Sequence, residues 1–124
     1  LGISGTTNMI KVHVAGRILI SGKGVNNLKG TGNVCVCNTL EDLEQNFHPG
    51  DIVVVPQTTN EMMQELRDAG GIITETGDRY SHAAVVGMAL DIPVITSARN
   101  ATKILKSGAF ITVDAEQGTV YSGC

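Results

Sequence analysis

The chain has 124 residues, the length of a single domain, and 42% of them are hydrophobic, which is enough for one packed core. Aromatic residues make up only 3%, so the core must be aliphatic, and the composition argues against a single-stranded nucleic-acid binder, which needs several aromatic stacking platforms. The net charge of -3 gives no electrostatic footprint for nucleic acid or a membrane surface. We therefore expect an α/β sandwich with neither of these partners.

The predicted strands are short segments of alternating or continuous β-branched and aliphatic residues. In chain order they cover residues 9–14, 17–20, 33–37, 51–56, 72–74, 93–96, 109–113 and 119–121. The run at 51–56 is apolar almost throughout, which indicates a strand buried on both faces. Residues 21–32 are rich in Gly, Asn and Lys and are expected to form a loop.

The predicted helices begin at residues that can cap a helix. In chain order, the first helix ends near residue 46 and the second contains residues 62–66. The third covers residues 81–90 and the fourth covers residues 100–106. Asn38 with Glu41 three residues later predicts the first N-terminus, and Thr58 with Glu61 predicts the second. Strands and helices alternate in the middle of the chain, while both ends are rich in strands. This order predicts a parallel sheet together with an antiparallel layer.

The cysteine pattern gives no disulfide framework and no zinc-ligand spacing. Cys35 and Cys37 are one residue apart in a predicted strand, so both side chains should point to one face and pack as small apolar groups. No segment resembles a signal peptide or is long enough to span a membrane. We therefore expect a reduced, cytoplasmic protein without a metal site.

The charges are distributed unevenly along the chain. Four of the nine basic residues and none of the twelve acidic ones lie in residues 1–40, so this part carries +4 and the rest carries -7. The four basic residues are Lys11, Arg17, Lys23 and Lys29. They form either a solvated basic loop or a small anion site.

One candidate phosphate- or effector-binding segment precedes the first predicted strand, at residues 9–14. It combines hydroxyl side chains with a glycine, and such a segment can present backbone N–H groups to an oxyanion. It consists of Ser4, Gly5, Thr6, Thr7 and Asn8. A plain turn is the alternative interpretation.

The strongest candidate for chemistry is His82, which a turn places in the first turn of an apolar helix. The positive end of the helix dipole disfavours imidazolium, so the ring stays neutral and nucleophilic, and free N–H groups there would stabilise an attached phosphoryl group. The residues expected to support this turn are Gly77, Asp78, Tyr80, Ser81 and Ala83. A histidine that merely caps or packs at a helix start is the alternative.

The sequence around His82 resembles the phosphohistidine domain, also called the swivelling or mobile domain, of phosphoenolpyruvate-utilising enzymes. The resemblance is carried by residues 72–75, Gly77, 81–86 and 92–95, and it extends over about 16–122. It implies a three-layer β/β/α sandwich with a central, largely parallel sheet, in which His82 is the phosphoryl acceptor. The chain departs from the family pattern at Asp78, Tyr80, Gly87 and Met88.

Residues 1–15 resemble the effector loop and last strand of the allosteric domain of pyruvate kinase, and residues 86–93 resemble the mobile domain that certain bacterial pyruvate kinases carry as a C-terminal extension. This resemblance implies two parts, 1–15 from the preceding domain and 16–124 as the mobile domain. It also implies upstream kinase domains as partners, a phosphorylated effector and a homotetramer. Magnesium and potassium are expected only in the kinase domains, and no cofactor in this domain.

Three functional hypotheses follow from these patterns. In the first, the domain is a regulatory or structural appendage of the kinase and lacks the kinase active site. In the second, His82 is a working carrier that accepts a phosphoryl group from phosphoenolpyruvate or a nucleotide. In the third, the domain is an independent anion-binding module, which a titration with nucleotides and sugar phosphates would test.

Overall fold

The computed structural model describes residues 16–123, and residues 1–15, including the predicted strand at 9–14, lie outside this range. Its strands are β1 (Ile18–Ser21), β2 (Lys23–Gly24), β3 (Lys29–Val36), β4 (Ile52–Val55), β5 (Gly71–Thr74), β6 (Val94–Thr96), β7 (Phe110–Asp114) and β8 (Thr119–Ser122). Its helices are α2 (Leu40–Asn46), the 3-10 helix η1 (Asn60–Met62), α3 (Met63–Leu66), α4 (His82–Leu90) and α5 (Ala101–Ile104).

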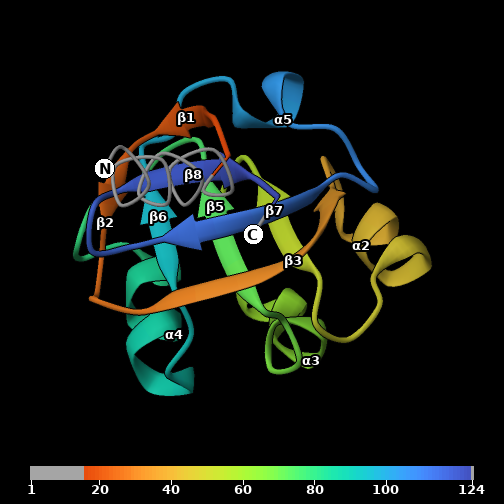
Figure 1. Cartoon of the computed structure of the whole chain (residues 1–124). Coiled ribbons are helices and arrows are strands. Elements are labelled where there is room, and N and C mark those ends of the chain that lie inside the picture. The colour runs from red at the N-terminus through yellow and green to blue at the C-terminus, as the bar shows by residue number, and fades with distance from the viewer. Residues whose placement is uncertain (1–15, 124) are drawn as a thin grey trace, which may run out of the picture.

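Strand β3 joins the two parts of the sheet (Figure 1). Its first half pairs antiparallel with β7, with Asn33 opposite Phe110, and its second half pairs parallel with β4, with Val34 opposite Ile52. The strand order is β1-β8-β7-β3-β4-β5-β6-β2, in which β3 to β6 are parallel and the two outer groups are antiparallel. The expected parallel sheet and antiparallel layer are therefore confirmed, and they are parts of one continuous sheet.

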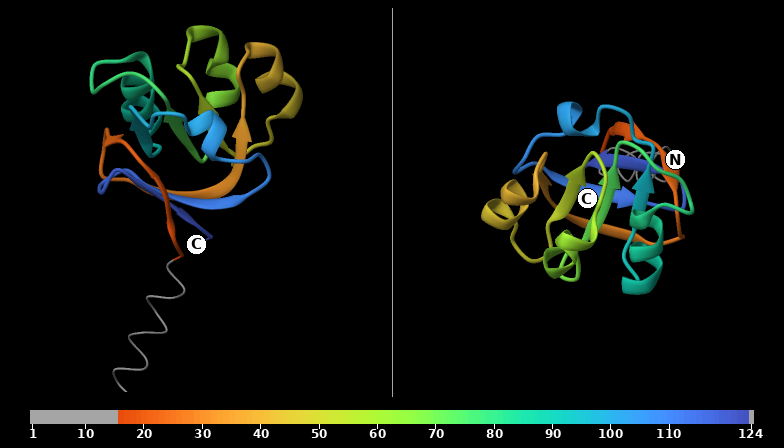
Figure 2. Two further views of the ribbon diagram at one scale, coloured as in Figure 1. Left: turned by 90° about the horizontal axis from the view of Figure 1, so that it is seen from above. Right: turned by 180° about the vertical axis from the view of Figure 1, so that it is seen from behind.

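The sheet folds over itself and helices cover its parallel part, which gives three layers (Figure 2). One apolar cluster lies between the two sheet layers and includes Ile52 and Val54, whereas a second lies under α2, α3 and α4 and includes Val53 and Val55. Alternate residues of β4 thus enter opposite cores, as expected for a strand buried on both faces. The β/β/α sandwich is confirmed. Helix α5 lies outside the layer formed by α2, α3 and α4, because its Ala101 belongs to the apolar cluster between the two sheet layers.

The segment expected to be a loop, residues 21–32, contains β2 and the first half of β3, so that prediction was wrong. Its composition is typical of turns, but the neighbouring strand β7 supplies backbone partners along this half of β3. Gly32 also lies where a side chain would meet the Gly50 carbonyl oxygen, 2.4 Å from an added Cβ. Close backbone packing, which local propensity does not report, therefore selects glycine in this strand.

The helix starts are shifted relative to the sequence prediction. Thr39, not Asn38, caps α2: its hydroxyl accepts from the Asp42 backbone N–H at 3.1 Å. The Asp42 carboxylate in turn accepts from the Asn38 N–H at 3.1 Å. The helix start is therefore capped by Thr39 and Asp42, each one residue later than the predicted pair Asn38 and Glu41. Thr58 does not cap the second helix, which begins as the 3-10 turn η1.

The last helix is shorter than predicted and ends at Ile104 rather than at residue 106. Asn100 occupies its N-cap position but makes no side-chain cap hydrogen bond. Instead, the Glu75 carboxylate accepts from both the N–H and the hydroxyl of Thr102, at 2.9 and 2.6 Å. A carboxylate from a distant loop therefore satisfies the helix start.

The cysteine prediction is confirmed for the two cysteines within the described range. Cys35 and Cys37 are free thiols in the core under the helices, with their Sγ atoms 3.4 Å apart. The hydrogen bond between the two thiols, and after it burial, raise the pKa of Cys37 far above its ordinary value, so this thiol stays protonated. Both side chains serve as small core residues.

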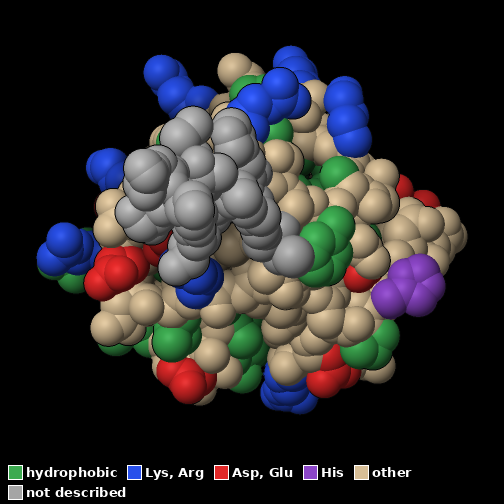
Figure 3. All heavy atoms as spheres, in the orientation of Figure 1, with side chains coloured by type: hydrophobic (Ala, Val, Ile, Leu, Met, Phe, Trp, Pro, Cys, Tyr) green, Lys and Arg blue, Asp and Glu red, His purple; other side chains and the backbone are tan. Residues whose placement is uncertain are grey.

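Among the residues that the structure describes, acidic side chains are absent from one edge of the surface. Figure 3 shows several Lys and Arg side chains and no Asp or Glu side chain along the edge where α5 lies, whereas basic and acidic side chains lie near one another at the left and at the bottom of this face. Over residues 16–123, none of the helices has the length and apolar character needed to cross a membrane.

Candidate functional site

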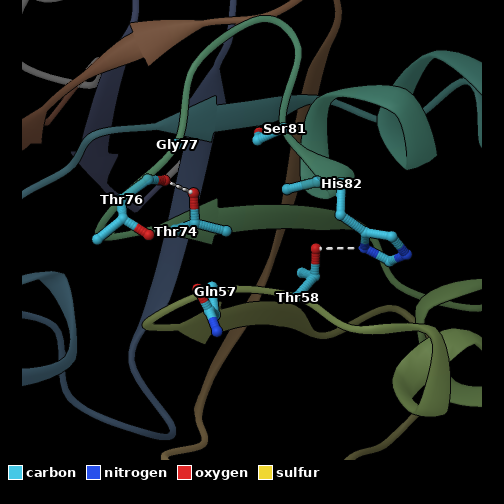
Figure 4. A pocket seen from close by; sticks show the side chains of 8 residues that line it. Gln57, Thr58, Thr74, Thr76, Gly77, Ser81 and His82 are labelled. Atoms are coloured by element: carbon cyan, nitrogen blue, oxygen red, sulfur yellow. Dashed lines mark hydrogen bonds between the residues drawn. The ribbon is translucent and has the colours of Figure 1, made fainter.

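The site around His82 lies at the carboxyl ends of the parallel strands β4 and β5 (Figure 4). Thr58 follows β4, Thr74 ends β5, and His82 is the first residue of α4 after the turn that follows β5. Open α/β sheets place ligands at this edge, because the loops after successive parallel strands meet there. The sequence prediction that a turn delivers His82 to a helix start is confirmed.

Both ring nitrogens of His82 have hydrogen-bond partners. Nδ1 lies 2.8 Å from the Thr58 hydroxyl oxygen, toward which Figure 4 shows the ring directed, and Nε2 lies 2.8 Å from the Asn60 amide oxygen. Because an amide oxygen can only accept, Nε2 carries the proton and Nδ1 accepts from the Thr58 hydroxyl. The neutral imidazole is therefore fully paired, and neither nitrogen offers a free lone pair.

Ser81 holds the turn before His82 in place. Its hydroxyl donates to the Asp78 carbonyl oxygen at 2.7 Å and accepts from the Ala84 N–H at 3.4 Å, so it is the N-cap of α4 as predicted. Gly77 has a φ of 102°, in the region that favours glycine. The Ser97 hydroxyl donates to the Gly77 carbonyl oxygen at 2.6 Å and ties the turn to the end of β6.

A small cavity of about 130 Å³ opens beside the imidazole. Apart from His82 it is lined mainly by hydroxyl and other neutral side chains: Gln57, Thr58, Thr74, Thr76, Gly77, Ser81 and Ala83. Among these described residues there is no Lys or Arg, so a phosphoryl dianion attached here would meet hydroxyl and amide groups rather than a cation.

One carboxylate near the imidazole has a shifted pKa. The pKa of Glu61 lies below its ordinary value because its own backbone N–H and the Thr59 hydroxyl donate to the carboxylate. The environment of His82 therefore contains an exposed anion and no compensating cation among the pocket residues.

The residues expected to support His82 separate into two groups. Gly77, Ser81 and Ala83 line the His82 cavity, whereas Asp78 and Tyr80 line a different cavity on the other side of the turn. The Asp78 carboxylate accepts from the Tyr80 N–H at 2.8 Å, and Tyr80 is 81% exposed. The imidazole is thus neither paired with Asp78 nor covered by Tyr80.

Sequence reasoning missed two partners of His82, Thr58 and Asn60. The sequence pattern predicts that Thr58 caps a helix, and it gives Asn60 no role. One signal was available for Thr58: a hydroxyl residue directly after a buried parallel strand lies at the sheet edge where sites form. The segment Ser4, Gly5, Thr6, Thr7 and Asn8 lies outside the described residues, so its role stays a prediction.

A three-layer β/β/α sandwich whose helix after the third parallel strand of its central sheet, β5, opens on a histidine defines a swivelling domain of the phosphohistidine type. The chain belongs to the family described as "PEP-utilising enzyme, mobile domain", which matches residues 47–118.

Curated relatives extend the similarity beyond that segment. The chain is 42% identical to a pyruvate kinase of Bacillus licheniformis and 43% identical to one of Geobacillus stearothermophilus, over 123 residues in each case. These matches cover 99% of this chain but only 21% of each kinase. The chain therefore spans about a fifth of the length of these relatives.

A solved structure supports the fold. Aconitase X of Thermococcus kodakaraensis in its holo-form matches with a TM-score of 0.64 at 21% identity, over 83% of this chain and 96% of that one. At this identity the similarity concerns the fold alone.

Proposed function

We propose that this chain is the C-terminal mobile domain of a pyruvate kinase and serves that enzyme as a regulatory or structural appendage. The similarity to two pyruvate kinases over almost the whole chain supports this assignment. The reaction, which forms ATP and pyruvate from ADP and phosphoenolpyruvate, would take place in the part of the enzyme beyond this domain. Those upstream domains are the first partner that we propose.

The observation that carries the appendage role is the hydrogen bonding of His82. A nucleophilic imidazole needs a free lone pair, but Nδ1 accepts from Thr58 and Nε2 donates to Asn60. Phosphorylation at either nitrogen would break one of these bonds and would place a dianion in a cavity lined without Lys or Arg. The geometry therefore favours His82 as a group that connects α4 to the loop after β4.

The experiment that tests this role removes residues 16–124 from the full-length kinase. We expect altered activation by sugar phosphates or nucleotides, or a lower melting temperature, with catalysis by the kinase domains retained. His82→Ala in the full-length enzyme is the matched control and should leave kinase turnover unchanged. Unaltered activation together with unaltered thermal stability in the truncated enzyme would contradict the proposal.

A second candidate function is a working phosphoryl carrier at His82. It is favoured by the position of the ring at the first residue of α4, a helix of nine residues whose N-terminus attracts negative charge. Incubation of the full-length enzyme with labelled phosphoenolpyruvate or ATP, followed by mass spectrometry, tests it. An acid-labile adduct that disappears in His82→Ala would establish the carrier, and we expect no such adduct.

The remaining assignments follow from the proposed kinase. We propose a cytoplasmic homotetramer whose phosphorylated effector binds the segment Ser4 to Asn8. Size-exclusion chromatography with light scattering on the full-length enzyme tests the tetramer, and Thr6→Ala with Thr7→Ala tests the effector segment. These two substitutions should weaken activation by a sugar phosphate without changing turnover in its absence.

A further inference from the structure

The turn 77–81 separates two cavities of different size and chemistry. The His82 cavity on one side holds about 130 Å³, whereas the cavity on the other side holds about 520 Å³. The larger volume lies within the range of small-molecule sites, roughly 300–1,000 Å³. Its walls include Lys23, Val25, Asp78, Arg79, Tyr80 and Thr96.

Two elements far apart in the sequence bring these side chains together. Strand β2 pairs with β6 so that Lys23 lies opposite Thr96, and β2 is the last strand at this edge of the sheet. The turn is fixed beside it by the hydrogen bond from Ser97 to the Gly77 carbonyl and by the bond from the Tyr80 N–H to Asp78. Figure 1 shows the loop between β5 and α4 passing next to β2. The cavity therefore has anchored walls on both sides.

The charge of the larger cavity is opposite to that of the chain. Lys23 and Arg79 supply two positive charges and Asp78 one negative charge, so the walls carry an excess of one positive charge in a chain of net charge -3. A guanidinium and an ammonium that line the same cavity match the oxygens of a phosphate group, because the guanidinium can donate two parallel hydrogen bonds. This cavity offers the cations that the His82 cavity lacks.

Tyr80 supplies an aromatic surface in the same cavity. The side chain is 81% exposed, so a large part of its ring is not packed against the protein. An exposed aromatic ring beside basic groups is the arrangement on which a nucleic-acid base stacks, since every base has a flat π face. The Asp78 carboxylate already accepts from the Tyr80 N–H and has further lone pairs for hydroxyl donors.

We propose that the cavity between β2 and the 77–81 turn binds a nucleoside phosphate. Lys23 and Arg79 hold the phosphate, Tyr80 stacks on the base, and Asp78 accepts from the sugar hydroxyls. Binding here requires neither a reactive His82 nor attached kinase domains, so this site and the appendage role can fail independently.

The test is a titration of the 124-residue chain, labelled with ¹⁵N, with AMP, ribose 5-phosphate and adenosine. We expect saturable shifts of the Gly24, Arg79 and Thr96 amide signals with AMP, and at least fivefold weaker binding of the two partial ligands. Arg79→Ala and Lys23→Ala should each weaken AMP binding, and higher ionic strength should do the same. Lys103→Ala on α5 is the matched control and should bind AMP as the parent chain does.

Tyr80 separates base stacking from simple phosphate attraction. Tyr80→Leu should weaken AMP binding by roughly fivefold or more, whereas Tyr80→Phe keeps the ring and should bind like the parent chain. Equal affinity for AMP and ribose 5-phosphate, or AMP binding unchanged in Tyr80→Leu, would overturn the nucleoside assignment. Absence of saturable shifts at millimolar AMP, or shifts confined to Gly77, Ser81 and Ala83, would overturn the site itself.

Discussion

The Nδ1 atom of His82 lies 2.8 Å from the hydroxyl oxygen of Thr58, a residue 24 positions earlier in the chain. Thr58 is buried, with 7% of its surface exposed, so its hydroxyl has little access to water. The bond joins the first residue of α4 to the loop after β4. It also selects the tautomer, because a nitrogen that accepts this hydroxyl proton cannot carry its own.

We predict that neutral His82 is protonated at Nε2 and that Thr58→Val reduces the free energy of unfolding by about 1 kcal/mol, since a buried hydrogen bond is lost. The ¹⁵N shifts of the imidazole ring report the tautomer, and urea unfolding reports the stability. Thr31→Val, at an exposed position of β3, is the control and should have a smaller effect. A ring protonated at Nδ1 would contradict the assignment of Asn60 as acceptor.

Gly77→Ala should destabilise the domain, because the residue has a φ of 102° and an added Cβ would lie 2.9 Å from the Ser81 hydroxyl oxygen. That hydroxyl cannot move freely, since it caps α4 and donates to Asp78. Gly108→Ala is the matched control: its φ is 90°, but an added Cβ meets open space. Both variants carry a backbone cost of about 1–3 kcal/mol. We expect a lower melting temperature for Gly77→Ala, and equal values would refute the steric argument.

Gly87→Ala tests the packing of α4 on the sheet. Alanine in a helix interior is ordinarily favoured over glycine by about 1 kcal/mol. Here an added Cβ would lie 2.2 Å from a methyl carbon of the fully buried Val94, so we expect a net loss of about 1–3 kcal/mol from overpacking.

The double variant Gly87→Ala, Val94→Ala provides the control for this prediction. Removing the two Val94 methyl groups makes room for the new Cβ, so the double variant should lose less stability than the sum of the two single losses. Unfolding in urea measures all three variants. Strict additivity, or a stabilised Gly87→Ala, would show that α4 can move away from β6 at no cost.

Glu61 gives a pH dependence whose sign is fixed by its lowered pKa. The carboxylate of Glu61 binds a proton less readily in the folded chain than in the unfolded chain. Its contribution to the free energy of unfolding is therefore present above the ordinary pKa of Glu, and it disappears as the pH falls through the lower pKa of Glu61 in the folded chain. Glu61→Gln should therefore lower the melting temperature at about pH 7 but not at about pH 3. Glu44→Gln, at an exposed position of α2, is the control. A difference in melting temperature between Glu61→Gln and the parent chain that grows as the pH falls would contradict the prediction.

The residue pattern by itself determined most of the elements of this domain. The apolar run at 51–56 predicted a strand buried on both faces, and β4 has this burial because alternate side chains enter the two cores. The Ser81-His82 sequence predicted the start of α4, because a serine N-cap acts on N–H groups within its own turn. These features depend on neighbours along the chain, so the sequence alone contains the information needed to predict them.

The tertiary structure decided the features that depend on distant residues. The Gly-rich segment 21–32 contains strands because β6 and β7 provide their hydrogen-bond partners. Thr58 bonds to His82 rather than to its own helix because the loops after β4 and β5 meet at one edge of the sheet. The turn residues face two cavities, and only the position of Lys23 on β2 gives one of them its second cation. Spacing along the chain located His82, whereas the packing of separate elements determined what surrounds it.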